Sequence, residues 1–123
     1  NDYGKVALKT IQNFKESYSI TEVYACAAKE VFPTKSTQEK SCPKNTFLGL
    51  CEEGIVKGIP KGNYTRSIKN KAYALQVIAI LKKGNSTSIS PKELWKELNL
   101  GDKKHNSQMD VVLALWNEGL IVK

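Results

Sequence analysis

Acidic residues are missing between Gly54 and Lys92, although they occur on both sides of this stretch. No apolar run approaches the roughly 18 residues of a membrane span, and no apolar signal segment opens the chain. Histidine occurs once and cysteine three times, without the CxxC spacing of a zinc site. We therefore expect a cytoplasmic protein with reduced thiols, no membrane association, no metal and no cofactor.

The composition fits one compact globular domain, with 123 residues of which 41% are hydrophobic. The net charge is +7, and it is unevenly placed. Residues 61–72 hold four basic residues and no acid, a net charge of +4. Such a local positive field is typical of a surface that meets an anionic partner. The alternative is a solvated linker whose charge only keeps the protein soluble.

Two stretches of the chain repeat one pattern. Residues 47–56 match residues 112–121 at a constant offset, which places Gly54 opposite Gly119 (119 − 54 = 65). Residues 7–15 match 74–82 at an offset of 67, and 19–21 match 88–90 at 69. Small loop insertions explain the drift in the offset, because loops tolerate them. We predict two copies of one helical unit, with residues 1–57 as the first repeat, 58–69 as a basic connector and 70–123 as the second.

Helical spacing of apolar residues predicts an all-α fold of two three-helix units related by a pseudo-two-fold. The predicted helices cover about 3–16, 22–32, 43–53, 69–83 and 91–98, and a sixth carries Met109 and ends at Gly119. Prolines, cap residues and glycines set these ends, while residues 34–41 are predicted to be a loop. The helix over 69–83 is apolar almost all round and is expected to be the central buried element. Trp116 is expected in the core. Residues 55–56 and 120–121 take equivalent positions and could pair as a minimal antiparallel ribbon.

The connector is the first candidate site. Its glycines allow close backbone approach to a ligand, and the helix that follows offers N–H groups to an anion at its start. Arg66 can grip a phosphate with two parallel hydrogen bonds, and Tyr64 offers a flat face to a base or sugar. The alternative is a purely structural turn. The candidate ligand-binding residues here are Lys57, Lys61, Tyr64, Thr65, Arg66, Lys69 and Lys71.

The start of the last helix, residues 103–108, is the second candidate site, with Lys104, His105 and Gln108 as its candidate ligand-binding residues. Lysine can hold phosphate, and glutamine carries the donor and acceptor pair that reads adenine. The loop over 100–106 is longer than the turn of a helix-turn-helix, which counts against a recognition helix. A capped helix start with solvated lysines is the alternative.

A catalytic thiol is the third and weakest candidate. Cys42 precedes Pro43 at a predicted helix start between two lysines, a setting that lowers the pKa of a thiol. His105 is the only histidine, and no third member of a catalytic group is visible. Glu52 and Glu53 sit in a last helical turn, where the helix dipole disfavours acids. They indicate either pairing with basic residues of the connector or a solvated helix end.

Long strings of this sequence resemble those of a small bacterial family that is a domain of unknown function. The strings are KGIPKGNYTRS, KKHNSQMDVVLALWNEGL and CPKNTFLGLCEEGIVKGIP, and the resemblance covers essentially the whole chain. It implies no activity and no catalytic residue.

We therefore favour a non-catalytic binding protein whose connector engages a phosphate-bearing partner, either nucleic acid or an anionic, nucleotide-like small molecule. One alternative is a small enzyme that uses the same pocket, with Cys42, His105 or Tyr64 as the working group. Another is a protein–protein adaptor whose charge serves solubility alone.

Overall fold

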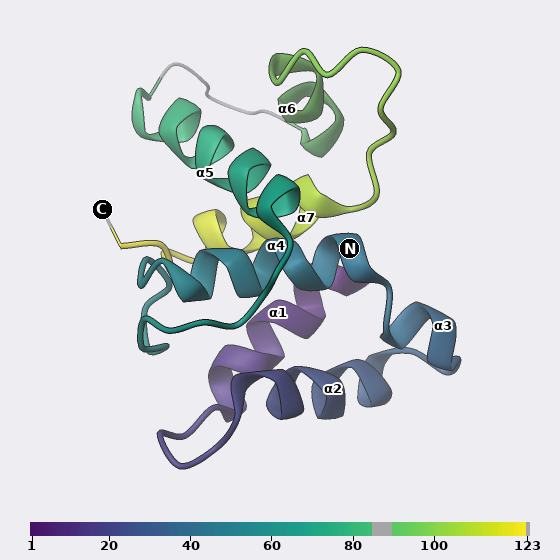
Figure 1. The fold of residues 1–123 in the computed structure, drawn as a ribbon, viewed down its shortest axis with the longest axis vertical. Coiled ribbons are helices and arrows are strands. Elements are labelled where there is room, and N and C mark those ends of the chain that lie inside the picture. The colour runs from purple at the N-terminus through teal and green to yellow at the C-terminus, as the bar shows by residue number, and fades with distance from the viewer. Residues whose placement is uncertain (85–89, 123) are drawn as a thin grey trace.

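The structure is a computed structural model that describes residues 1–84 and 90–122. These residues form an all-α fold in which α4 and α7 lie between the pair α1–α2 and the pair α5–α6 (Figure 1). The helices are α1 (Asp2–Asn13), α2 (Ile20–Val31), α3 (Lys35–Gln38), α4 (Ser41–Glu52), α5 (Ile68–Lys82), α6 (Pro91–Glu97) and α7 (Gln108–Asn117). Within the described ranges, no helix is long and apolar enough to cross a bilayer.

The core is built mainly around α4 and α7, and both helices bury several large apolar side chains completely. In α4, Phe47 and Leu50 are fully buried, and in α7 Met109, Val112 and Leu115 are as well. Burying each such side chain contributes about 1.5–3 kcal/mol, so these two helices supply much of the driving force for folding.

Some helix ends differ from the predictions. Asn1 caps α1 by accepting hydrogen bonds from the N–H groups of Tyr3 and Gly4, and α1 ends at Asn13 rather than near residue 16. The expected loop over 34–41 contains α3, because the Thr34 hydroxyl caps a single helical turn. At α6 the prediction is confirmed, since Ser90 is the N-cap and Pro91 follows at the first helical position.

The ends of α4 and α7 are alike. Gly54 and Gly119, just after the two helices, both adopt a positive φ, +76° and +69°. The segments that follow meet in an isolated antiparallel bridge between Val56 and Ile121. Lys57 N donates to Leu120 O and Val122 N donates to Ile55 O, each at 2.8 Å. The contact between the two segments is thus one bridge, and no strand occurs in residues 1–84 or 90–122.

Two helix pairs come unusually close. A Cβ on Gly4 would lie 2.9 Å from Cβ of Ala114, so α1 and α7 approach almost backbone to backbone. A Cβ on Gly49 would lie 2.8 Å from Cβ of Lys71, which gives the same close approach between α4 and α5. The offsets of the sequence repeat relate these pairs, since 49 + 65 = 114 and 4 + 67 = 71. The match of 19–21 with 88–90 falls partly outside the described residues.

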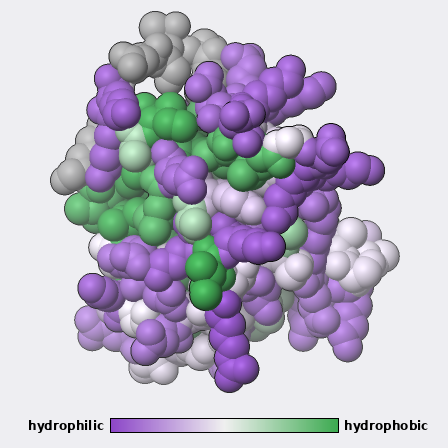
Figure 2. All heavy atoms as spheres, turned by 45° about the horizontal axis from the view of Figure 1, so that its top comes forward, coloured by the Kyte–Doolittle hydropathy of each residue, from purple (hydrophilic) through white to green (hydrophobic). Residues whose placement is uncertain are grey.

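The prediction that the helix over 69–83 is the central buried element is wrong. α5 buries one face, with Tyr73, Val77 and Ile78 among its buried residues, and leaves the other open. Ile68 is 82% exposed, and Leu75 is half-buried. Figure 2 shows apolar atoms gathered on the face of the molecule where α5 lies. Trp116 is half-buried as well, whereas the adjacent Leu115 is fully buried.

Candidate anion-binding site

Glu52, in the last turn of α4, anchors the connector. Its Oε1 accepts hydrogen bonds from Tyr64 N at 2.8 Å and Thr65 N at 3.2 Å, and its Oε2 lies 2.7 Å from Lys71 Nζ. Lys71 also pairs with Glu53. The bond with Lys71 and the two N–H donors lower the pKa of Glu52 to about 2. Of the two interpretations that the sequence left open for these acids, the structure shows pairing, and the partner is Lys71 in α5 rather than a residue of the connector over 58–69.

The same contacts engage three of the predicted ligand-binding residues. Lys71 is held by two carboxylates, and the N–H groups of Tyr64 and Thr65 point at Glu52. The Thr65 hydroxyl donates to Asn45 Oδ1 at 2.9 Å. The Tyr64 hydroxyl donates to Pro60 O at 2.6 Å, and burial raises its pKa. In the fold, Glu52 of α4 thus lies against the connector, whose own sequence contains no acid.

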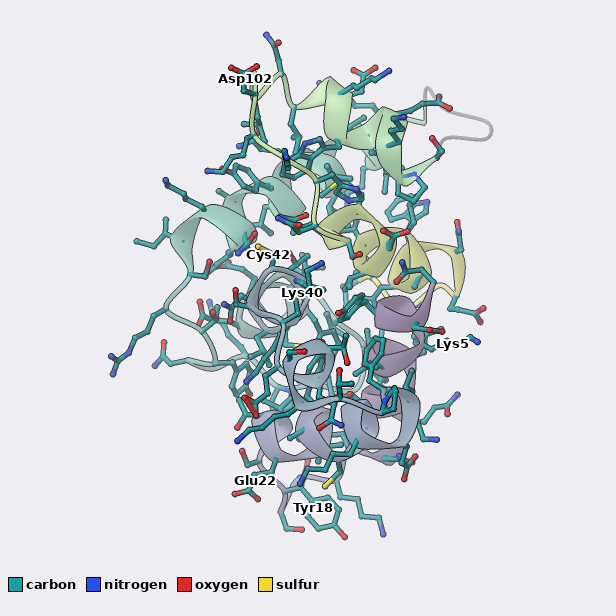
Figure 3. All side chains as sticks on the ribbon, turned by 90° about the vertical axis from the view of Figure 1, so that its right-hand side faces the viewer. Lys5, Tyr18, Glu22, Lys40, Cys42 and Asp102 are labelled. Carbon is teal, nitrogen blue, oxygen red and sulfur yellow. The ribbon has the colours of Figure 1, made fainter. Side chains whose placement is uncertain are left out.

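A basic cleft lies beyond these contacts, where the connector enters α5. Its walls are the start of α5, the loop over 103–106, the start of α7 and the first turn of α4, and its volume is about 470 Å³. In Figure 3, Cys42 marks the α4 wall, between α5 and the loop that descends from Asp102. The basic residues that line it are Arg66, Lys69, Lys103 and Lys104. No acidic side chain of the described residues lines this basic cleft.

The basic cleft therefore combines parts of the two predicted sites. Arg66 and Lys69 come from the connector, and Lys104 and Gln108 from the start of α7. Lys57 and Lys61 are exposed and are not among its lining residues.

Lys103 joins the site although it was not among the predicted ligand-binding residues. Its Nζ lies 5.4 Å from the centroid of the Tyr73 ring, and the hydrogen bond to Tyr73 raises the pKa of the lysine. It is therefore a cation at neutral pH. The sequence did carry a signal for it, because Lys103 begins the basic stretch over 103–108 that forms the second candidate site.

An amide network joins α5 to α7 at the floor of the basic cleft. Gln108 is 3% exposed, its Oε1 accepts from Asn106 N at 2.6 Å, and its Nε2 donates to Asn70 Oδ1 at 3.2 Å. Asn70 Nδ2 in turn donates to Ser67 Oγ at 3.1 Å. These bonds fix Gln108 and Asn70 in position, so the two helix starts are held together without a charged group.

His105 caps α7. Its Nε2 accepts from Met109 N at 3.0 Å, its ring lies 5.2 Å from the Trp95 ring, and Asp110 Oδ2 lies 4.0 Å from Nε2. Burial lowers the pKa of His105, while Asp110 opposes this shift. A nitrogen that accepts the Met109 N–H is unprotonated, so this contact favours the neutral ring. His105 is not among the residues that line the basic cleft.

The three thiols are free and lie in different surroundings. Cys26 is exposed, Cys51 is buried in the core, and Cys42 is half-buried in the wall of the basic cleft. Burial raises the pKa of Cys51 far above its ordinary range. Since His105 Nε2 bonds to the α7 backbone, the imidazole is not set up as a base for Cys42. No group of three or more metal-ligating side chains occurs within residues 1–84 and 90–122.

These observations define an all-α protein with a basic cleft at the meeting point of three helix starts. A family model described as "Family of unknown function (DUF6979)" matches residues 1–122, and the chain belongs to that family. No curated protein and no solved structure matches the chain significantly.

Proposed function

We propose that this protein is a non-catalytic binding protein that holds the phosphate of a nucleic acid or a nucleotide-like ligand in the basic cleft. One observation carries the proposal, namely that four cationic side chains share a recess that no acid of the described residues lines. Like charges gathered in one recess repel one another, so a folded chain tolerates them best where an anion binds.

Arg66 is the residue on which the proposal rests most heavily. It is exposed, and it makes no hydrogen bond or ion pair with the described part of the chain. Its planar guanidinium can therefore turn toward a ligand and form two parallel hydrogen bonds with phosphate oxygens. Lys69 and Lys104 are exposed as well and can add charge without first breaking an ion pair.

The start of α5 supports the same site. Ser67 is its N-cap residue, but the serine hydroxyl accepts a hydrogen bond from the Asn70 side chain and none from a backbone N–H of the helix. The first N–H groups of this 15-residue helix thus lack a side-chain cap, and the positive end of its dipole faces the basic residues. A phosphate could satisfy these donors.

We also propose that the two halves are repeats and that the site occurs once because one connector joins them. The paired glycines after α4 and α7, the bridge between Val56 and Ile121 and the two close helix contacts support this proposal. Three free thiols support a cytoplasmic location.

A protein–protein adaptor is the second candidate, and the exposed Ile68 beside the open face of α5 favours it. An enzyme that uses Cys42 has less support, because His105 is engaged elsewhere.

Titration of an Arg66→Ala variant tests the proposed function. We expect it to weaken binding of single-stranded DNA, duplex DNA or mononucleotides by about 1.5–3 kcal/mol, the scale of a hydrogen bond to a charged group. Arg66→Lys should recover only part of the lost binding free energy, because an ammonium group cannot form two parallel hydrogen bonds with a phosphate.

Lys82→Ala is the matched control, since Lys82 is exposed at the other end of α5, about 20 Å from Lys69. Each titration is run at two salt concentrations, because binding through phosphates falls steeply with salt. If Arg66→Ala and Lys82→Ala lose the same amount of binding affinity, the effect comes from net charge alone. No binding of any anion would favour the adaptor.

A further inference from the structure

A second recess, the outer hollow, adjoins the basic cleft across Arg66 and Ser67. It lies between the start of α2, α4 and the connector, with a volume of about 540 Å³. Arg66 and Ser67 line both recesses, and Lys44, Asn45 and Tyr64 line the outer hollow alone. As in the basic cleft, no acid of the described chain is among the lining residues. Arg66 and Ser67 thus border both recesses, which are together called the path, and the same two residues also border a third recess that Glu52 and Lys71 line.

The number of cations along this path exceeds what one phosphate group uses. A terminal phosphate carries a charge of about −1.5 to −2 at neutral pH. The path offers five basic side chains, namely Lys44, Arg66, Lys69, Lys103 and Lys104. A ligand with several phosphates spaced along a chain would match this charge better than a single phosphate.

Polar groups in the outer hollow could contact sugars and bases. Asn45 Oδ1 accepts from the Thr65 hydroxyl, which fixes the amide and leaves its NH₂ group to donate. Tyr64 is half-buried, with its hydroxyl bonded to Pro60 O, so its ring is held in place. A fixed ring and a fixed amide beside a basic residue are typical of surfaces that bind unpaired nucleotides.

On the basis of the proposed function, we infer that the ligand is a single-stranded nucleic acid that crosses both recesses. One phosphate lies in the basic cleft, Arg66 contacts the strand at the junction, and a neighbouring nucleotide occupies the outer hollow. The backbone from Tyr64 to Lys69 can span at most about 18 Å, and a strand advances about 3.4 Å per nucleotide in a duplex. The site therefore takes at most about five nucleotides.

Titration of the full chain with ligands of different length tests this inference. The probes are a nucleoside monophosphate, a nucleoside triphosphate, a single strand of about five nucleotides and the corresponding duplex. We expect the single strand to bind the wild type at least about tenfold more tightly than either mononucleotide, because it alone fills both recesses.

Two lysine variants separate the recesses. Lys44→Ala should weaken binding of the single strand about threefold to tenfold and leave the monophosphate unchanged, whereas Lys104→Ala should weaken both. Each should lower the salt slope for the single strand by about 0.7, the value for one lost phosphate contact. Lys82→Ala should alter none of these quantities.

Three results would overturn the inference while leaving the proposed function intact. They are equal affinities for the monophosphate and the single strand, tightest binding of the triphosphate or of the duplex, and a Lys44→Ala variant that binds the strand as the wild type does. Failure of every phosphate ligand to bind would instead contradict the proposed function.

Discussion

At the scale of single residues, Glu52 connects three parts of the chain. Its carboxylate, 14% exposed, ties the end of α4 to the connector through the N–H groups of Tyr64 and Thr65, and to α5 through Lys71. Backbone N–H groups in a half-buried loop need partners, and here a side chain supplies them in place of water. The direction in which the Arg66 side chain extends from the connector thus depends on Glu52, an acid fourteen residues earlier (66 − 52 = 14).

Glu52→Gln should destabilise the fold by about 1–2 kcal/mol at neutral pH, since the amide keeps the shape but loses the charge that Lys71 meets. The loss of stability caused by Glu52→Gln should depend on pH. The pKa of Glu52 is about 2 in the fold against an ordinary 4.5, so the unfolded chain binds more protons between these values. The stability that the carboxylate contributes is complete above about pH 4.5 and is lost as the pH falls toward 2.

Urea unfolding of the wild type and of Glu52→Gln at pH 7 and near pH 2.5 measures this effect. The difference between the two proteins should narrow at the lower pH. Glu118→Gln is the control, because Glu118 is an exposed acid at the corresponding end of α7. A gap that is equally wide at both pH values would show that the carboxylate charge is not what stabilises the connector.

At the scale of elements, Gly54 and Gly119 test the proposed repeat. Both residues adopt a left-handed conformation that costs other residues about 1–2 kcal/mol. Gly54→Ala and Gly119→Ala should each lower the free energy of unfolding by about that amount. Gly54→Ala should cost slightly more, because its Cβ would lie 3.1 Å from Cβ of Lys61, while Gly119 has open space. If only one substitution is destabilising, the two helix ends are not equivalent.

The helices could largely be predicted from the sequence, because apolar spacing, prolines and glycines act over a few residues. The burial of α5 could not. Its apolar residues lie all round, and sequence does not reveal that only one face meets α4 and α7. Trp116 shows the same limit, since its spacing fits the buried face of α7 but the side chain is half-buried.

The candidate site was predicted less completely than the helices. Arg66, Lys69, Lys104 and Gln108 line the basic cleft, but they belonged to two separate hypotheses that only the packing of α5 against α7 joins. Lys71 and Thr65 are engaged by Glu52 and Asn45, contacts between segments far apart in the chain. The position of Glu52 against the helix dipole suggested pairing with a basic residue as one of two interpretations, and nothing in the sequence indicated the contact between Asn45 and Thr65.

At the scale of the whole molecule, folding divides the charge of the connector into parts with different roles. Lys71 is neutralised by two acids, and Lys57 and Lys61 extend into solvent. Arg66 and Lys69 join Lys103 and Lys104 around the basic cleft. The net charge of +7 alone would favour loose attraction to any anion, whereas a recess with fixed walls favours binding at one place.

Alkylation of the three cysteines shows whether a phosphate ligand occupies the basic cleft. Cys42 lines the basic cleft, Cys26 is exposed on α2, and Cys51 is buried, so the chain carries its own probe and two controls. The folded protein is treated with iodoacetamide with and without a saturating single-stranded oligonucleotide, and labelling of each thiol is followed by mass spectrometry. We expect the oligonucleotide to slow labelling of Cys42 and to leave labelling of Cys26 unchanged, while Cys51 stays unreactive with and without it. Unchanged labelling of Cys42 at a saturating oligonucleotide concentration would show that the ligand does not occupy the basic cleft.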